Sequence, residues 1–176
     1  MKNLTTSEIA RKNVLNNKYA LEEVQKAIGL RGVVFEGELK FTKQQIASFF
    51  EVSERSINSS LQQNDQELRL NGYDVIRGNR LKSFKLAVIE SDVKEVNFPN
   101  KTPQLGIFNF RAFINIAMLL NKSERAREVR SLVLDIVIDT INKRTGGNTK
   151  YINQRDEDFI FNLLNNKDYH REMVLA

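Results

Sequence analysis

The chain has 176 residues, 41% of them hydrophobic, which is enough for one domain or two small ones with a real core. Its formal net charge of +5 favours a polyanionic partner. The absence of cysteine excludes disulfides, thiolate metal sites and cysteine nucleophiles, and the single histidine, His170, leaves little for zinc or Ser-His-Asp chemistry. We therefore expect no cofactor, no metal site and no enzymatic activity.

The N-terminal segment lacks the apolar core of a signal peptide. No stretch approaches the roughly 18 uninterrupted apolar residues of a membrane-spanning helix. These two observations predict a cytoplasmic protein without a membrane partner.

The first elements predicted are a helix and a short β segment. Residues 7–29 have apolar residues at helical spacing and end on a glycine, which commonly stops a helix, while Asn16 and Asn17 can bend or break it. Residues 33–35 and 39–41 then flank Glu36-Gly37-Glu38. This segment is either a tight hairpin or one interrupted strand.

Two short helices joined by a tight turn are predicted next. Thr42 can cap the first helix, with Gln45 three residues later completing a capping box. The chain breaks at Glu51-Val52, and Ser53 is a candidate cap for the second helix. That second helix, over about residues 53–63, has its apolar residues Ile57 and Leu61 one turn apart.

A basic hairpin is expected to follow. Residues 73–76 and 81–88 read as strands, joined by residues 77–80, where glycine and asparagine tolerate the positive φ of a tight turn. Residues 91–104 contain both prolines of the chain and read as a linker between an N-terminal domain, 1–90, and a second module, 105–176.

The second module is predicted to be helical. Residues 105–108 read as a short strand, Asn109 as the cap of a helix to residue 120, and Ser123 as the cap of the next helix. The latter has a strong apolar stripe over 129–141, which suggests homodimerisation, and a last helix is expected over 155–175. The apolar end of the chain is compatible with a further C-terminal domain or a protein partner.

The order helix, strand, two capped helices and hairpin is that of a winged helix-turn-helix, so the expected fold is mostly α (α+β), with a helical module after it. Residues 44–57 resemble the helix-turn-helix of bacterial and phage regulators, with small Ala47 where the two helices cross. The sequence departs from that pattern at Glu51, where glycine is usual, and at Ser60, where an apolar residue is common.

This resemblance implies a sequence-specific regulator that binds double-stranded DNA, with residues 53–63 in the major groove and the wing, 73–88, on the minor groove or backbone. Side chains expected at base edges are Arg55, Ser56, Asn58, Ser59 and Gln62. Those expected at phosphates, at helix starts, are Thr42, Gln44 and Ser53. The wing would add Arg77, Asn79, Arg80 and Lys82.

The second half, residues 108–137, resembles a segment of phage antirepressors and RhuM-like virulence proteins, in which a Ser-x-x-Ala turn leads into a long apolar helix. That resemblance implies transcription regulation in a prophage or mobile element.

Other interpretations remain open. The same fold can pack on a protein instead of DNA, as an antitoxin-like or adaptor module. The basic hairpin can be an ordinary solvated surface. Phe108, Phe110 and Phe113 read as core residues more readily than as base-stacking ones, and the cations of residues 122–130 as an ion-paired helical surface.

Overall fold

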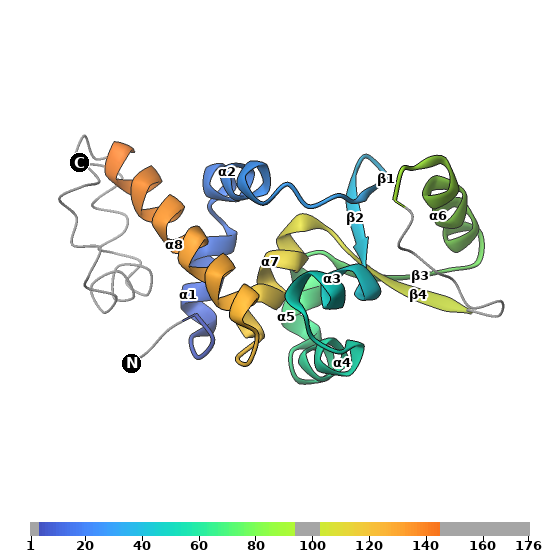
Figure 1. Cartoon of the computed structure of the whole chain (residues 1–176), viewed down its shortest axis with the longest axis horizontal. Coiled ribbons are helices and arrows are strands. Elements are labelled where there is room, and N and C mark those ends of the chain that lie inside the picture. Colours follow the sequence, from blue (N-terminus) through green and yellow to red (C-terminus); the bar gives the residue numbers. More distant parts are fainter. Residues whose placement is uncertain (1–3, 94–102, 145–176) are drawn as a thin grey trace.

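A computed structural model describes residues 4–93 and 103–144 of the chain (Figure 1). The described part is mostly helical with a small antiparallel sheet, which confirms the predicted α+β class. The helix predicted over residues 155–175, and His170 within it, lie outside the described residues.

The N-terminal helical segment is broken into α1 (Glu8–Leu15) and α2 (Lys18–Ile28). The break falls at the two asparagines because Asn17 starts a new helix: its side-chain oxygen accepts a hydrogen bond from the backbone N–H of Ala20 at 3.1 Å. Gly29 ends α2 as predicted, in the left-handed region at φ 61°.

Strands β1 (Val33–Phe35) and β2 (Glu38–Thr42) form a tight hairpin, which decides between the two predicted alternatives. The sheet is completed by β3 (Tyr73–Arg77) and β4 (Gln104–Phe108), in the order β1-β2-β4-β3. All of its neighbouring strands are antiparallel.

The hairpin predicted over residues 73–88 is wrong in its second half. Residues Gly78–Glu90 form helix α6, and β3 pairs with β4 instead. The reason lies in the spacing of the apolar residues: Leu81, Phe84 and Val88 are three and four residues apart, so they share one helical face, and all three are buried.

The two faces of the sheet pack against different helices. On β4, Phe108 belongs to the main core and its neighbour Ile107 to a second, smaller cluster, because successive side chains of a strand point to opposite faces. The smaller cluster lies under α6, where Phe84 contacts Phe35 edge to face at 5.3 Å. Figure 1 shows α6 on one side of the sheet and the other helices on the opposite side.

Helices α7 (Phe110–Leu119) and α8 (Glu124–Arg144) begin at the predicted caps, Asn109 and Ser123. Apolar residues of both helices belong to the same main core as α1 to α4. The linker predicted between the two modules, residues 91–104, lies after β3 in the chain and reaches the first residue of β4. These two strands pair with each other, so one sheet contains residues from both predicted modules. The apolar stripe of α8, which suggested a dimer, contributes five side chains to this internal core: Val129, Val133, Val137, Ile138 and Ile141.

A short helix that the sequence patterns do not indicate, α5 (Asp65–Leu70), joins a polar network inside the fold. Glu67 of α5 accepts two hydrogen bonds from Arg11 of α1, at 2.8 and 2.9 Å. It also accepts one from Asn115 of α7 at 2.6 Å, and Asn115 in turn accepts one from Asn71 at 2.8 Å. These contacts tie three helices together through groups that are largely out of water.

Candidate nucleic-acid interface

Helices α3 (Lys43–Phe50) and α4 (Glu54–Gln63) meet across a three-residue turn, as predicted. The capping box is present: the hydroxyl of Thr42 accepts from the Gln45 N–H at 3.2 Å, and the Gln45 side-chain oxygen accepts from the Thr42 N–H at 2.9 Å. Ser53 caps α4 by accepting from the Ser56 N–H at 3.2 Å. Local hydrogen bonds thus fix where each helix begins.

The turn itself depends on Glu51, which ends α3 in the left-handed region at φ 57°. A glycine is common at this position because it adopts positive φ without strain. The conformation expected from the helix-turn-helix pattern is therefore present without the usual residue. The N–H of Val52 donates to the carbonyl oxygen of Ala47 at 3.0 Å and closes the turn.

We expect Glu51→Gly to raise the free energy of unfolding by up to about 1 kcal/mol, because it relieves the left-handed strain of a non-glycine residue. The gain is reduced by the extra freedom of glycine in the unfolded chain. Glu22→Gly, at an exposed position inside α2, is the matched control and should lower stability by roughly 0.5–1 kcal/mol. Urea unfolding measures the free energy of unfolding of both variants. Equal losses of stability in the two would contradict the presence of left-handed strain at Glu51.

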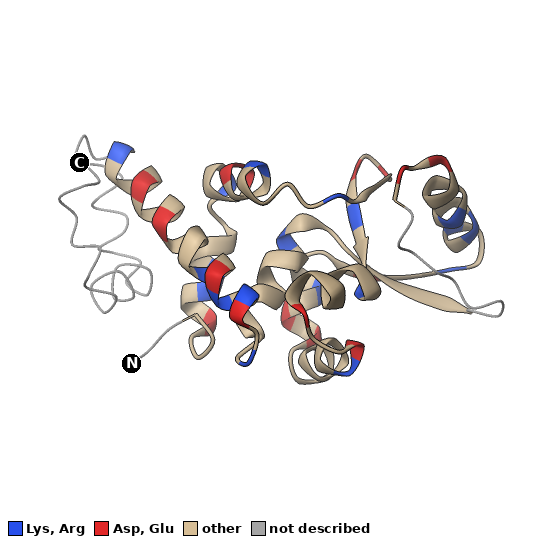
Figure 2. Ribbon diagram, viewed as in Figure 1, with Lys and Arg blue, Asp and Glu red and all other residues tan. Residues whose placement is uncertain are grey.

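Helix α4 has one buried and one exposed face. Ile57, Ser60 and Leu61 are buried, so both Ser60 and its apolar neighbour face the core. The opposite face carries four exposed polar residues spaced i, i+3, i+4 and i+7, namely Arg55, Asn58, Ser59 and Gln62. Figure 2 shows that this helix is largely free of charged residues.

The residues expected at phosphates differ in exposure. Thr42 is buried, at 3% exposure, and its hydroxyl is used in the capping box, so it is not presented to a DNA backbone. Gln44 is half-buried at the start of α3, and Ser53 is exposed. Ser56 is half-buried, and its hydroxyl lies 3.3 Å from that of Ser53.

The four residues predicted for the wing do not form a hairpin tip. Arg77 is exposed at the end of β3, whereas Asn79, Arg80 and Lys82 are exposed on the first turns of α6. Arg80 donates hydrogen bonds to Glu36 at 2.5 Å and to Asp74 at 2.8 Å, and these bonds raise the pKa of its guanidinium above its ordinary value. Its charge is therefore balanced within the protein, so Arg80 is a weaker candidate for a phosphate contact than Arg77.

The aromatic residues near residue 110 are core residues, as predicted. Phe108 and Phe113 are fully buried and Phe110 is 8% exposed, so none is presented to an unstacked base. The cations at the start of α8 do not form the expected pairs with their own helix. Arg125 pairs with Glu51 at 3.6 Å, and Arg130 donates to carbonyl oxygens at the end of α7.

Within residues 4–93 and 103–144, no helix combines the length and apolarity needed to cross a bilayer. The same residues contain no group of three or more acidic or histidine side chains placed to hold a metal ion.

Comparison of the chain with protein-family models, with curated proteins and with solved structures finds no match.

Proposed function

We propose that this protein binds double-stranded DNA sequence-specifically, with α4 in the major groove. The observation that carries the proposal is the exposed stripe of α4, where Arg55, Asn58 and Gln62 lie on one face. Arginine can bind guanine through two hydrogen bonds, and asparagine or glutamine can bind adenine in the same way. Such a stripe suits a groove that admits one α-helix.

We also propose that the fold is a winged helix-turn-helix. The order of elements supports this: helix α2, strand β2, helices α3 and α4, and then the antiparallel pair β3 and β4. In this proposal the wing is the β3–β4 pair, with α6 inserted between its strands. Arg77, exposed and without an ion-pair partner in the part of the chain that is described, is the cation that the wing offers to the DNA backbone.

The wider role is a cytoplasmic transcription regulator of a prophage or mobile element, as the resemblances imply. A homodimer belongs to the proposal because readers of this kind usually bind two half-sites. Since the apolar stripe of α8 packs inside its own chain, the dimer would have to use another surface. Light scattering of the protein with and without duplex DNA tests this point.

We expect Asn58→Ala to weaken binding to the preferred duplex by roughly tenfold, because one bidentate base contact contributes about 1–3 kcal/mol of discrimination. This substitution leaves the net charge unchanged, so binding to unrelated duplexes should stay the same. Arg55→Gln should weaken specific binding by a similar factor and should also alter the salt dependence. The preferred duplex is obtained by selection from a random pool at two salt concentrations.

Lys18→Gln is the matched control for lost charge, because Lys18 is exposed at the start of α2 and has no ion-pair partner among residues 4–93 and 103–144. It should leave sequence preference intact. Two results would contradict the proposal: no enrichment of any sequence at low salt, or equal effects of Asn58→Ala and Lys18→Gln on specific binding.

A protein-interaction module is the second candidate, and exposed apolar residues of α6 favour it. Leu86 is 60% and Ile89 77% exposed, and their spacing of three puts them on one face of the helix. Solvent-exposed apolar side chains that adjoin one another are typical of interaction surfaces. If a protein is the ligand, Leu86→Ser with Ile89→Ser should abolish its binding, whereas Arg55→Gln should leave it unchanged.

A further inference from the structure

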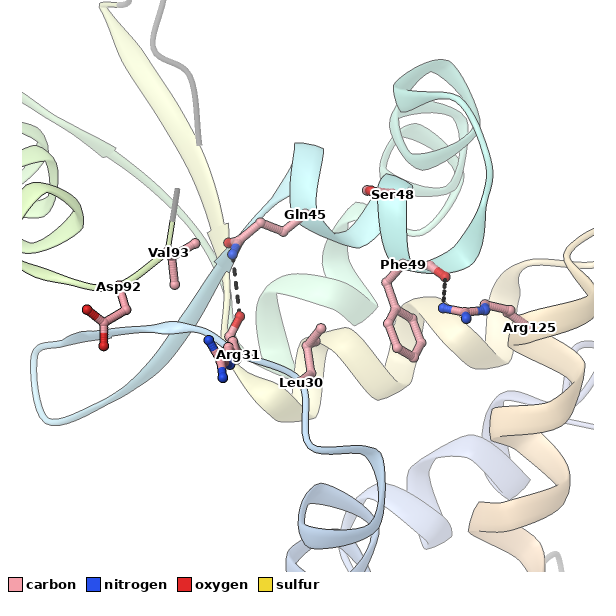
Figure 3. A pocket seen from close by; sticks show the side chains of 8 residues that line it. All are labelled: Leu30, Arg31, Gln45, Ser48, Phe49, Asp92, Val93 and Arg125. Carbon is pink, nitrogen blue, oxygen red and sulfur yellow. Dashed lines mark hydrogen bonds between the residues drawn. The ribbon is translucent and has the colours of Figure 1, made fainter. Parts of the chain in front are cut away.

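A pocket of about 420 Å³ lies beside α3, between the segment that follows α2, the start of α8 and the residues just after α6 (Figure 3). Its volume is in the range of roughly 300–1,000 Å³ that is usual for small-molecule sites. It is also well above the roughly 150 Å³ of an apolar cavity that accommodates benzene. The pocket therefore has room for a ligand with more than one ring.

The pocket has an apolar floor. Leu30 and Phe49, which pack on the main core, form it and are only partly buried. Val93 also lines the pocket but packs against the smaller cluster under α6. Figure 3 shows Leu30 between Arg31 and the ring of Phe49. The Phe49 ring is held edge to face against Phe50 at 5.1 Å, so this floor is in place before any ligand binds. The guanidinium of Arg125 lies over the Phe49 ring, 5.2 Å from its centroid, so a flat apolar body would contact Leu30 and the part of Phe49 that stays exposed to water.

One end of the pocket carries a free positive charge. Arg31 is exposed, and its guanidinium has no hydrogen bond or ion pair to any residue of the described ranges. Its backbone is held in place, because the Gln45 side chain donates to the Arg31 carbonyl oxygen at 3.4 Å. At the other end, Arg125 is already engaged, since it donates to the Phe49 carbonyl oxygen at 3.1 Å and pairs with Glu51.

We propose that this pocket binds a small organic anion with a flat apolar body. The anionic group is bound by the guanidinium of Arg31, which suits a planar carboxylate. The apolar body lies against Leu30 and Phe49, and the exposed hydroxyl of Ser48 is available to a polar substituent. Asp92 also lines the pocket, and its charge disfavours a second negative group, so the ligand is a monoanion. The pocket can bind such an anion whether or not α4 binds DNA.

The test uses the full chain and three probes: 2-naphthoate, its neutral analogue 2-naphthamide, and acetate, which has the charge without the rings. Calorimetry and NMR titration should detect binding of naphthoate, with intermolecular NOEs to the ring of Phe49 and the methyl groups of Leu30. Naphthamide and acetate should each bind at least about tenfold more weakly, because naphthamide lacks the negative charge and acetate lacks the rings.

Three variants distinguish the effect of the charges that line the pocket from the effect of the protein's net charge. Arg31→Gln should weaken naphthoate binding by about tenfold, and Asp92→Asn should strengthen it, while Lys18→Gln should change nothing. All three positions are exposed, so thermal unfolding should confirm that the variants remain folded. The proposal is overturned by absence of naphthoate binding, by equal binding of the amide, by equal affinities in Arg31→Gln and the unsubstituted chain, or by NOEs only to residues outside the pocket.

Discussion

Replacing Phe113 with alanine should lower the free energy of unfolding by about 3–5 kcal/mol, the usual cost of removing a large buried ring. Phe113 is fully buried in α7 and contacts rings from β2 and α3. Its ring centroid lies 5.0 Å from that of Phe50, 5.3 Å from that of Phe49 and 5.8 Å from that of Phe41. The cavity would therefore open where the sheet, α3 and α7 meet.

Urea unfolding followed by circular dichroism measures this loss. Leu70→Ala is the control, because Leu70 is a large apolar residue that is 78% exposed, and it should change stability by less than about 0.5 kcal/mol. A loss below about 1 kcal/mol for Phe113→Ala would mean that these elements do not share a core.

Replacing Arg11 with methionine is the second substitution with a large expected effect, a loss of about 3 kcal/mol. Arg11 and Glu67 form a two-bond ion pair with side chains only 8% and 13% exposed, so removing the cation leaves a carboxylate largely buried without its charge partner. Arg11 also donates to the carbonyl oxygen of Leu4 at 2.9 Å, and this bond is lost as well.

The exposed pair between Arg69 and Asp65 provides the control. Its side chains are 51% and 54% exposed, so Arg69→Met should cost less than about 1 kcal/mol. Similar losses for Arg11→Met and Arg69→Met would show that the Arg11 pair is solvated rather than structural.

The buried ion pair of Arg11 and Glu67 makes the stability of the protein depend on pH. Burial by itself raises the pKa of Glu67, but hydrogen bonds from Arg11 and Asn115 and the charge of Arg11 outweigh it, so the pKa lies below the ordinary 4.5. Because the pKa of Glu67 is lower in the folded than in the unfolded chain, its ionised form stabilises the folded state at pH values above the unfolded-state pKa, near 4.5. This contribution is lost as the pH falls through the pKa of Glu67 in the folded state. The cost of Glu67→Gln should therefore be full at pH 7 and should shrink in acid.

Helices α3 and α4 and the turn between them could be predicted from sequence because their signals are local. Thr42 and Gln45 are three residues apart, and Ser53 immediately precedes the helix that it caps, so each hydrogen bond joins near neighbours in the chain. The exposed stripe of α4 follows from helical spacing in the same way.

The hairpin expected over residues 73–88 is wrong in its second half because glycine and asparagine at residues 78 and 79 suit a turn, whereas the helical spacing of Leu81, Phe84 and Val88 is the stronger signal. The true partner of β3 comes after α6, so its pairing is not local. The ion pairs of Arg80 could not be predicted for a related reason: Glu36 is 44 residues away and becomes its neighbour only when α6 packs against β1.

The polar network of Arg11, Glu67 and Asn115 cannot be predicted from the sequence either. Arg11 and Glu67 are 56 residues apart, and charged residues are usually exposed, so nothing local identified them as buried partners. The pocket beside α3 likewise combines residues from four segments of the chain. Sites built from distant segments require the fold before they can be recognised.

Contact between α4 and DNA can be observed by titrating a short duplex into isotope-labelled protein and mapping the changes in amide NMR signals. We expect the largest changes at Arg55, Asn58 and Gln62, smaller ones at Arg77, and weakening of all of them with added salt. If no signal changes at low salt, or if the changes are confined to α1, α2 and α8, then α4 does not bind DNA.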